Sequence, residues 1–164
     1  MSYLVDGNNV MGQRVGWHRD KAGARRRLLS ELARLASGEG VRVEVVFDGA
    51  PDEHFPDGSY FMGVRVFYAA RGSDADSKIK RMVDAARERR TLVVVTSDRE
   101  LAAYVRASGV RVVRSGEFRH RLDAAVGPQR AGAGEREEPP SLSHEELLRE
   151  MRYFGVAPED DEEA

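Results

Sequence analysis

Short runs of apolar, β-branched residues alternate along the chain with segments whose apolar residues recur every three or four positions. The runs predict five strands, because β-branched side chains favour extended backbone. The recurring pattern predicts three helices, each with one apolar face. Their alternation indicates an α/β protein with a mostly parallel sheet between layers of helices. The predicted strands are residues 3–5, 41–47, 64–68, 91–96 and 110–113, and the predicted helices are residues 19–36, 73–90 and 97–107.

The pattern changes near the end of this alternation, where a second region is expected. Residues 127–141 are rich in Gly, Pro, Ala and charge, which is typical of a linker. Ser143 and Glu146 then have the spacing of a capping box and begin a short amphipathic helix. A helix of about eleven residues is marginal alone, so we expect it to dock on the domain, a second copy or another protein. The expected division is a domain over residues 1–125 and an appendage over 126–164, made of a linker, a helix over about 143–154 and an acidic, disordered tail.

Charge is divided unevenly between these two regions. Residues 1–124 hold 22 Lys and Arg against 17 Asp and Glu, a balance of +5. Residues 125–164 hold 4 against 11, a balance of −7, and the two balances sum to the net charge of −2. A basic body suits a nucleic-acid partner, although arginines on solvated helix faces would give the same count.

Composition excludes several classes of protein. The chain has no cysteine, which removes disulfides, thiolate nucleophiles and Cys-ligated metal sites and fits a reducing cytoplasm. No signal peptide is expected, and the longest run of large apolar residues, 92–95, is far short of a membrane span of about 20. Neither a P-loop nor a dinucleotide-binding motif follows the first strand. We therefore expect a cytoplasmic protein with no membrane partner.

Carboxylates follow most of the predicted strands. Asp6 ends the first strand, Asp48 follows the second, and Asp98 lies shortly after the fourth. Asp74 and Asp76 lie at the start of the helix after the third strand. Because the carboxyl ends of parallel strands share one edge, we expect these acids to converge there. Two carboxylates about 4 Å apart repel by roughly 4 kcal/mol at an effective dielectric of 20, which favours a bound cation. Oxygen ligands without His or Cys favour Mg²⁺ or Mn²⁺.

Most of these acids also have an ordinary structural explanation. Asp76 could close a capping box with Ser73, Asp98 could cap the next helix, and Asp48 could begin a turn. Asp6 has no clear capping partner after its buried strand, which makes it the strongest candidate for a functional carboxylate. A phospho-aspartate receiver is disfavoured, because Asp6 has no adjacent acid and no lysine follows the fifth strand.

Four segments in order over residues 2–123 resemble an NYN domain of the YacP-like group, which belongs to the PIN-like nuclease superfamily. The segments read LVDGNNV, VVFD, ADSKI and VTSD. The resemblance implies a PIN-like three-layer α/β/α sandwich and metal-dependent endoribonuclease activity. The implied partner is RNA, including RNA on the ribosome, and the implied products carry 5′-phosphate and 3′-hydroxyl ends. By this resemblance Asp6, Asp76 and Asp98 would hold Mg²⁺ or Mn²⁺, Asn9 would orient Asp6 or the substrate, and Asp48 matches the acid that closes the second strand.

One position departs from the family's pattern. Lys80 stands where family members often carry a glutamate, whereas Asp74 adds an acid upstream as a further candidate ligand. The alternative function is therefore an RNA- or ribosome-binding module of the same fold that has lost catalysis. In either case basic residues are expected to contact phosphates beside the acids. The candidates for these contacts are Arg71, Lys78, Arg99 and Arg119.

Overall fold

The structure, a computed structural model, describes residues 1–70 and 72–132, with side chains through residue 125. The elements follow one another as β1 (Ser2–Asp6), α1 (Gly7–Met11), the 3₁₀ helix η1 (Trp17–Arg19), α2 (Lys21–Glu39), β2 (Arg42–Phe47), β3 (Tyr60–Phe61), β4 (Val64–Tyr68), α3 (Ala75–Ala85), β5 (Leu92–Val95), α4 (Arg99–Ala107), β6 (Arg111–Val113) and α5 (Ser115–Gly132).

A six-stranded sheet lies at the centre, with the strand order β3-β4-β2-β1-β5-β6. β1 pairs in parallel with both β2 and β5, and the pairs β2–β4 and β5–β6 are parallel as well. β3 joins the edge strand β4 in antiparallel orientation. All four residues of β5 are buried, as its apolar sequence predicts for an inner strand.

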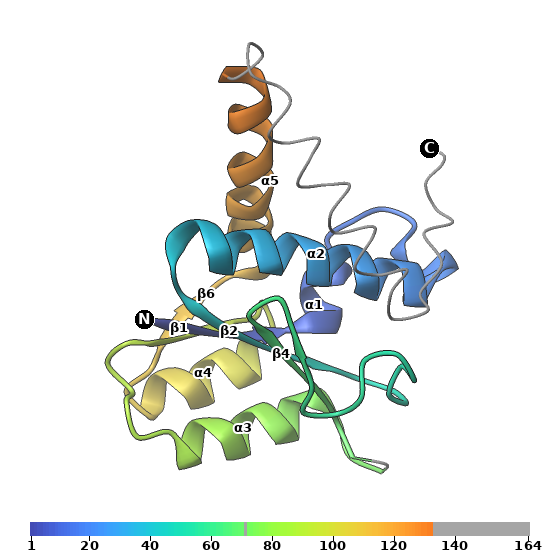
Figure 1. Ribbon diagram of the computed structural model, residues 1–164. Helices are drawn as coiled ribbons and strands as arrows, with labels where there is room; N and C mark the ends of the chain where they lie inside the picture. The colour runs from blue at the N-terminus through green and yellow to red at the C-terminus, as the bar shows by residue number, and fades with distance from the viewer. Residues whose placement is uncertain (71, 133–164) are drawn as a thin grey trace.

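Helices cover both faces of this sheet (Figure 1), with α1, α2 and α5 on one face and α3 and α4 on the other. The first layer packs through side chains such as Leu32 of α2 and Phe118 of α5. The second packs through Ile79 of α3 and Leu101 of α4. Complete burial of such a side chain contributes about 1.5–3 kcal/mol. The predicted three-layer α/β/α architecture is confirmed.

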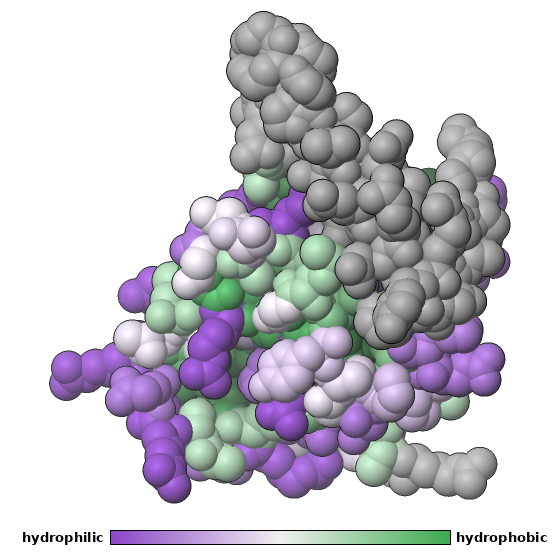
Figure 2. Space-filling model, in the orientation of Figure 1, coloured by the Kyte–Doolittle hydropathy of each residue, from purple (hydrophilic) through white to green (hydrophobic). Residues whose placement is uncertain are grey.

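On the face shown in Figure 2, hydrophilic residues lie at the left, lower and right edges, with hydrophobic and less polar residues between them. Among the described residues, Tyr60 and Met62 of the β3–β4 hairpin are large apolar side chains that remain exposed. Within residues 1–70 and 72–132, no helix is both long and apolar enough to cross a bilayer.

All five predicted strands and all three predicted helices are present, with ends shifted by a few residues. The sequence pattern missed α1, η1, β3 and α5. α1 begins with Gly7, Asn8 and Asn9, which are weak helix formers. α5 buries Phe118 and Leu122, one helical turn apart, but charged residues surround this pair in the sequence and hide its periodicity.

The C-terminal part of the structure differs from the expected linker. α5 continues to Gly132, so residues 126–132 extend a helix where a linker was predicted. The helix predicted over about 143–154 and the acidic tail lie outside the described residues.

Candidate active site

The carboxyl ends of β1, β2 and β5 lie at one edge of the sheet, as their parallel pairing requires. The chain passes from β1 outward to β2 and β4, then returns to β5 on the other side of β1. In open α/β sheets such a reversal creates a crevice in which ligands bind. Four acids surround this edge, which we name the carboxylate rim: Asp6, Asp48, Asp76 and Asp98.

Asp6 lies at the centre of the rim and is only 8% exposed. The Thr96 hydroxyl donates a hydrogen bond to Asp6 Oδ2 over 2.9 Å. Burial raises the pKa of Asp6 from 3.8 to about 6; the bond from Thr96 opposes this rise, and the charges of Asp48 and Asp98 add to it. A carboxylate in this position is costly to ionise, so a neighbouring cation would be favourable.

Helix α1 begins directly after Asp6, and its first residue packs closely against the end of β2. A Cβ atom on Gly7 would lie 2.5 Å from the Phe47 ring, so the close approach requires glycine. Asn9 Oδ1 accepts a hydrogen bond from Ser97 N over 2.8 Å and another from the Ser115 hydroxyl. Ser115 N in turn donates to Ser97 Oγ over 2.9 Å. Asn9 thereby holds α1 to the ends of β5 and β6, and its expected role toward Asp6 or substrate stays a prediction.

Asp48 connects three elements on the other side of β1. Its main-chain N–H donates to Asn8 Oδ1 over 2.9 Å, and its own Oδ1 accepts from Ala75 N at the start of α3 over 2.7 Å. The Arg25 side chain donates to the Asp48 carbonyl oxygen. Asp48 therefore positions the beginning of α3 and keeps a half-buried carboxylate at the rim.

Two of the other acids cap helices. Asp98 is the N-cap of α4, and its Oδ1 accepts from two main-chain N–H groups of the first turn over 2.9 and 3.1 Å. Asp74 caps α3 by accepting from Ser77 N over 2.9 Å, and this bond lowers the pKa of the exposed Asp74 carboxyl. The predicted capping box between Ser73 and Asp76 is therefore wrong, because α3 begins with Asp74 as its cap.

Asp76 is paired with the residue that departs from the family pattern. Lys80 Nζ lies 3.3 Å from Asp76 Oδ2, one turn along α3. This hydrogen bond, with the Asp76 charge, raises the pKa of Lys80. The second oxygen, Asp76 Oδ1, is buried and has no hydrogen-bond partner among the residues that the structure describes. Lys80 thus neutralises one oxygen of Asp76 and leaves the other unsatisfied.

The rim does not form a tight cluster of acids. Across residues 1–70 and 72–132, no three His, Asp or Glu side chains are grouped closely enough to hold a metal ion. The charge of Asp6 nevertheless interacts with those of Asp48 and Asp98. The predicted metal ligands Asp6, Asp76 and Asp98, with Asp48 and Asp74 as further candidates, stay predictions.

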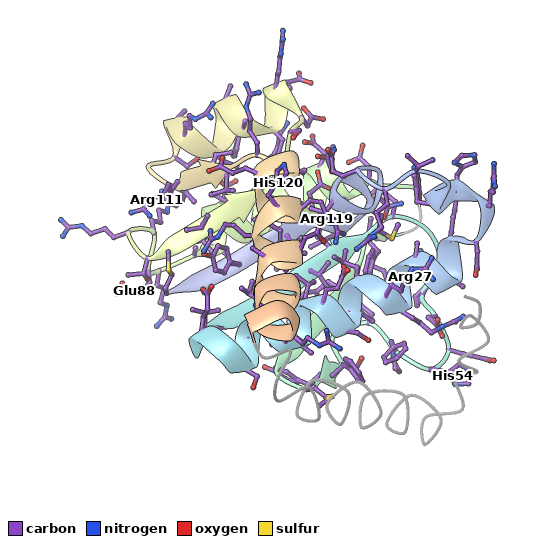
Figure 3. The ribbon with its side chains drawn as sticks, turned by 90° about the horizontal axis from the view of Figure 1, so that it is seen from above. Arg27, His54, Glu88, Arg111, Arg119 and His120 are labelled. Carbon is purple, nitrogen blue, oxygen red and sulfur yellow. The ribbon has the colours of Figure 1, made fainter. Side chains whose placement is uncertain are left out.

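The predicted phosphate-binding residues lie in different surroundings. Lys78 is half-buried on α3, and Arg99 is exposed at the first position of α4. Arg119 is buried and lies 2.8 Å from Glu31 Oε1, between α5 and α2 (Figure 3). Arg71 lies outside the described residues.

Three residues shape the site although the sequence analysis did not place them in it. Thr96 holds Asp6 from a position 90 residues away, and Asn8 and Ser115 make the connections described above. Only Thr96 has a signal in the sequence, a polar side chain directly after a buried strand, and this signal does not identify its partner.

The fold and the rim define the class: a nuclease-like three-layer α/β domain with acids at the reversal of strand order. The chain belongs to the YacP-like NYN domain family, whose model matches residues 3–152. This match extends beyond residues 2–123, over which the four motifs resemble the family. The family prediction is confirmed.

Solved structures agree with this assignment at the level of the fold. The structure is similar to crystal structures of Rae1 (YacP) from Bacillus subtilis, with a TM-score of 0.67 at 22% sequence identity over 94% of both chains. For a point mutant of that protein the TM-score is 0.66 at 22% identity over 90% of both chains. No curated protein sequence matches the chain.

Proposed function

We propose that this protein is a metal-dependent endoribonuclease that hydrolyses RNA phosphodiester bonds at the carboxylate rim. The observation that carries the proposal is Asp6, a buried carboxylate whose ionisation is opposed by burial and by two neighbouring acids. Folding does not require such a group, because an amide or an apolar side chain would fill the position at lower cost. Membership of the NYN family supports a nuclease in particular.

Two features of the rim fit a hard divalent cation. The candidate ligands are carboxylate oxygens, which Mg²⁺ and Mn²⁺ prefer. Asp76 Oδ1 is a buried acceptor with no donor within residues 1–70 and 72–125, and a cation would satisfy it. Asp6, Asp76 and Asp98 would hold the ion, and binding would have to draw these three side chains together, because they are not grouped closely in the described residues. A cation held by these residues would supply an activated water and would stabilise the charge on the leaving 3′-oxygen.

The remaining residues of the site position these acids and the substrate. Thr96 fixes the orientation of the Asp6 carboxylate through its hydroxyl. Asn9 keeps α1 against the loop that carries Asp98. Lys78 and Arg99, on the helices that begin at the rim, would contact phosphates on either side of the scissile bond.

A cleavage experiment tests the proposal. Labelled single-stranded RNA is incubated with the full chain or the Asp6→Asn variant, in Mn²⁺, Mg²⁺ or EDTA. Glu53→Gln is the matched control, because the Glu53 side chain is 88% exposed and Glu53 lies outside the rim. We expect cleavage that requires metal and falls at least about a hundredfold in Asp6→Asn only. Cleavage in EDTA, or equal rates for wild type and Asp6→Asn, would overturn the proposal.

One observation favours a second candidate function, an RNA-binding module without catalysis. Lys80 already neutralises Asp76 over 3.3 Å, which competes with a metal ion for that carboxylate. This candidate predicts salt-dependent RNA retention without turnover in any metal. Measuring retention and cleavage in the same samples separates the two functions.

A further inference from the structure

Four side chains of alternating aromatic and cationic type form a continuous row on β3, β4 and α3. The guanidinium carbon of Arg65 lies 5.1 Å from the ring centroids of both Tyr60 and Phe67. The ammonium nitrogen of Lys78 lies 5.2 Å from the Phe67 centroid. Tyr60 pairs with Arg65 across the strands, and Phe67 is two residues further, so the three share one face of the sheet. We name this set the β4 row: Tyr60, Arg65, Phe67 and Lys78.

The β4 row is accessible and begins close to the carboxylate rim. Lys78 is two positions after Asp76 on the first turns of α3, and the row ends at Tyr60 on the outermost strand of the sheet. Figure 1 shows β4 at this side of the sheet, with α3 below it. Tyr60 is 66% exposed, and Arg65, Phe67 and Lys78 are half-buried. A strand bound along the row would therefore reach the first turn of α3, which also carries Asp76 of the rim.

The positive charges of Arg65 and Lys78 are not paired with an acid of the described residues, so they are open to an anionic ligand. Arg65 Nε donates to the Gly58 carbonyl oxygen over 3.2 Å, which fixes the guanidinium between its two rings. No ion pair between described residues involves Arg65 or Lys78. Arg119, by contrast, is already paired with Glu31. Packing alone does not require two fixed cations without a counter-charge beside an exposed tyrosine.

This combination matches the chemistry of a single-stranded nucleic acid. Unpaired bases stack on aromatic rings and cations contact the phosphates, whereas a duplex keeps the faces of its bases inside its own stack. We infer that the β4 row binds the single strand beside the carboxylate rim, with a base on Tyr60 and phosphates at Arg65 and Lys78. The inference rests on the proposed function, because the bound strand is a substrate only if the carboxylate rim cleaves RNA. It adds that this substrate is single-stranded along the β4 row.

Binding of a fluorescein-labelled single-stranded RNA of about 12 nucleotides tests the inference, because such sites span roughly 4–16 nucleotides. Fluorescence anisotropy is measured in EDTA with the full chain, so the result does not depend on cleavage. We expect Tyr60→Ala to weaken binding about tenfold and Tyr60→Phe, which keeps the ring, to bind like wild type. An RNA duplex should compete poorly.

The cationic positions are tested through the dependence of binding on salt. Arg65→Gln and Lys78→Gln should each reduce the slope of log K against log salt by about 0.7, the value for one phosphate contact on a single strand. Arg111→Gln is the control, because Arg111 is exposed on the opposite edge strand β6 (Figure 3) and should leave the slope unchanged.

Three results would overturn the inference: no binding of the probe by wild type, wild-type affinity in Tyr60→Ala, or equal affinity for the duplex. Failure of the proposed nuclease function gives a different result. In that case wild type would bind the probe through the β4 row but would not cleave it when Mn²⁺ is added.

Discussion

The two sides of the carboxylate rim differ in what their acids do. On the β1–β5 side, Asp6 is buried against Thr96, and Asn9 connects α1 to Ser97 and Ser115. On the β2–α3 side, Asp48 accepts from the start of α3, and Asp76 is paired with a lysine. Each acid of the second side has a local donor or counter-charge that compensates its charge.

Most acids of the site therefore stabilise the fold, whereas the ionised Asp6 carboxylate destabilises it. Hydrogen bonds from the first turns of helices account for Asp48, Asp74 and Asp98 as parts of the structure, and an ion pair accounts for Asp76. Asp6 accepts from the Thr96 hydroxyl and from the Asn9 main chain, but burial and two like charges outweigh these bonds and raise its pKa to about 6. We interpret Asp6 as the centre of function and the β2–α3 side as its support. The predictions below test this division, from the largest expected effect to the smallest.

The largest effect is expected from comparing two caps, Asp98→Ser and Asp74→Ser. Serine is a good N-cap, so both variants should keep their helices and lose less than about 1 kcal/mol of unfolding free energy. Asp98 interacts with Asp6, whereas Asp74 is exposed and caps α3. RNA cleavage should fall at least about tenfold in Asp98→Ser and stay unchanged in Asp74→Ser. Equal activities in the two variants would remove Asp98 from the site.

A smaller effect, on stability, is expected from comparing the two asparagines of α1. Asn9→Ala leaves Ser97 N and the buried Ser115 hydroxyl without their acceptor, which should cost about 1–3 kcal/mol of unfolding free energy. Asn8→Ala removes a single acceptor, that of Asp48 N, and should cost about 1 kcal/mol. Urea denaturation measures both values. A larger loss in Asn8→Ala would show that the β2 side holds α1 in place.

The smallest effect is expected at Lys80. Lys80→Gln removes the positive charge that lies 3.3 Å from Asp76 and should tighten Mn²⁺ binding about two- to fivefold, because exposed ion pairs are weak. Calorimetric titration of the metal-free protein with Mn²⁺ measures this change. Lys78→Gln is the matched control, because Lys78 contacts the Phe67 ring instead. Weaker binding in Lys80→Gln would mean that Lys80 supports the site.

Much of this architecture is predictable from local sequence. Strand 92–95 is apolar throughout, which predicts an inner strand. Asp6 lies at the end of a buried strand, which places it at the sheet edge once parallel pairing is assumed. The contacts that complete the site are not local. Thr96 meets Asp6 across 90 residues, and Ser115 meets Asn9 across 106. No periodicity encodes such pairs, because tertiary packing alone brings them together.

The Lys80–Asp76 ion pair is an instructive intermediate case. Its i,i+4 spacing on a predicted helix is enough to predict the contact from the sequence. The sequence does not reveal that Asp76 Oδ1 stays buried and unsatisfied, because that depends on what packs around the start of α3.

The central claim is that Asp6 is kept at a cost to stability, and its pH dependence tests this directly. Since the pKa of Asp6 is 3.8 unfolded and about 6 folded, the folded state binds the proton more tightly. The contribution of Asp6 to stability, measured as wild type against Asp6→Asn, should therefore decrease as pH rises from about 4 to about 6. Above this range the full cost of ionisation is present, and below it the cost disappears.

The measurement is the unfolding free energy of wild type and Asp6→Asn in EDTA, at about pH 7.5 and about pH 4. We predict that Asp6→Asn is more stable than wild type by about 1–3 kcal/mol at the higher pH and equally stable at the lower pH. Added Mn²⁺ should stabilise wild type more than the variant. An Asp6→Asn variant that is less stable than wild type at the higher pH would contradict the account.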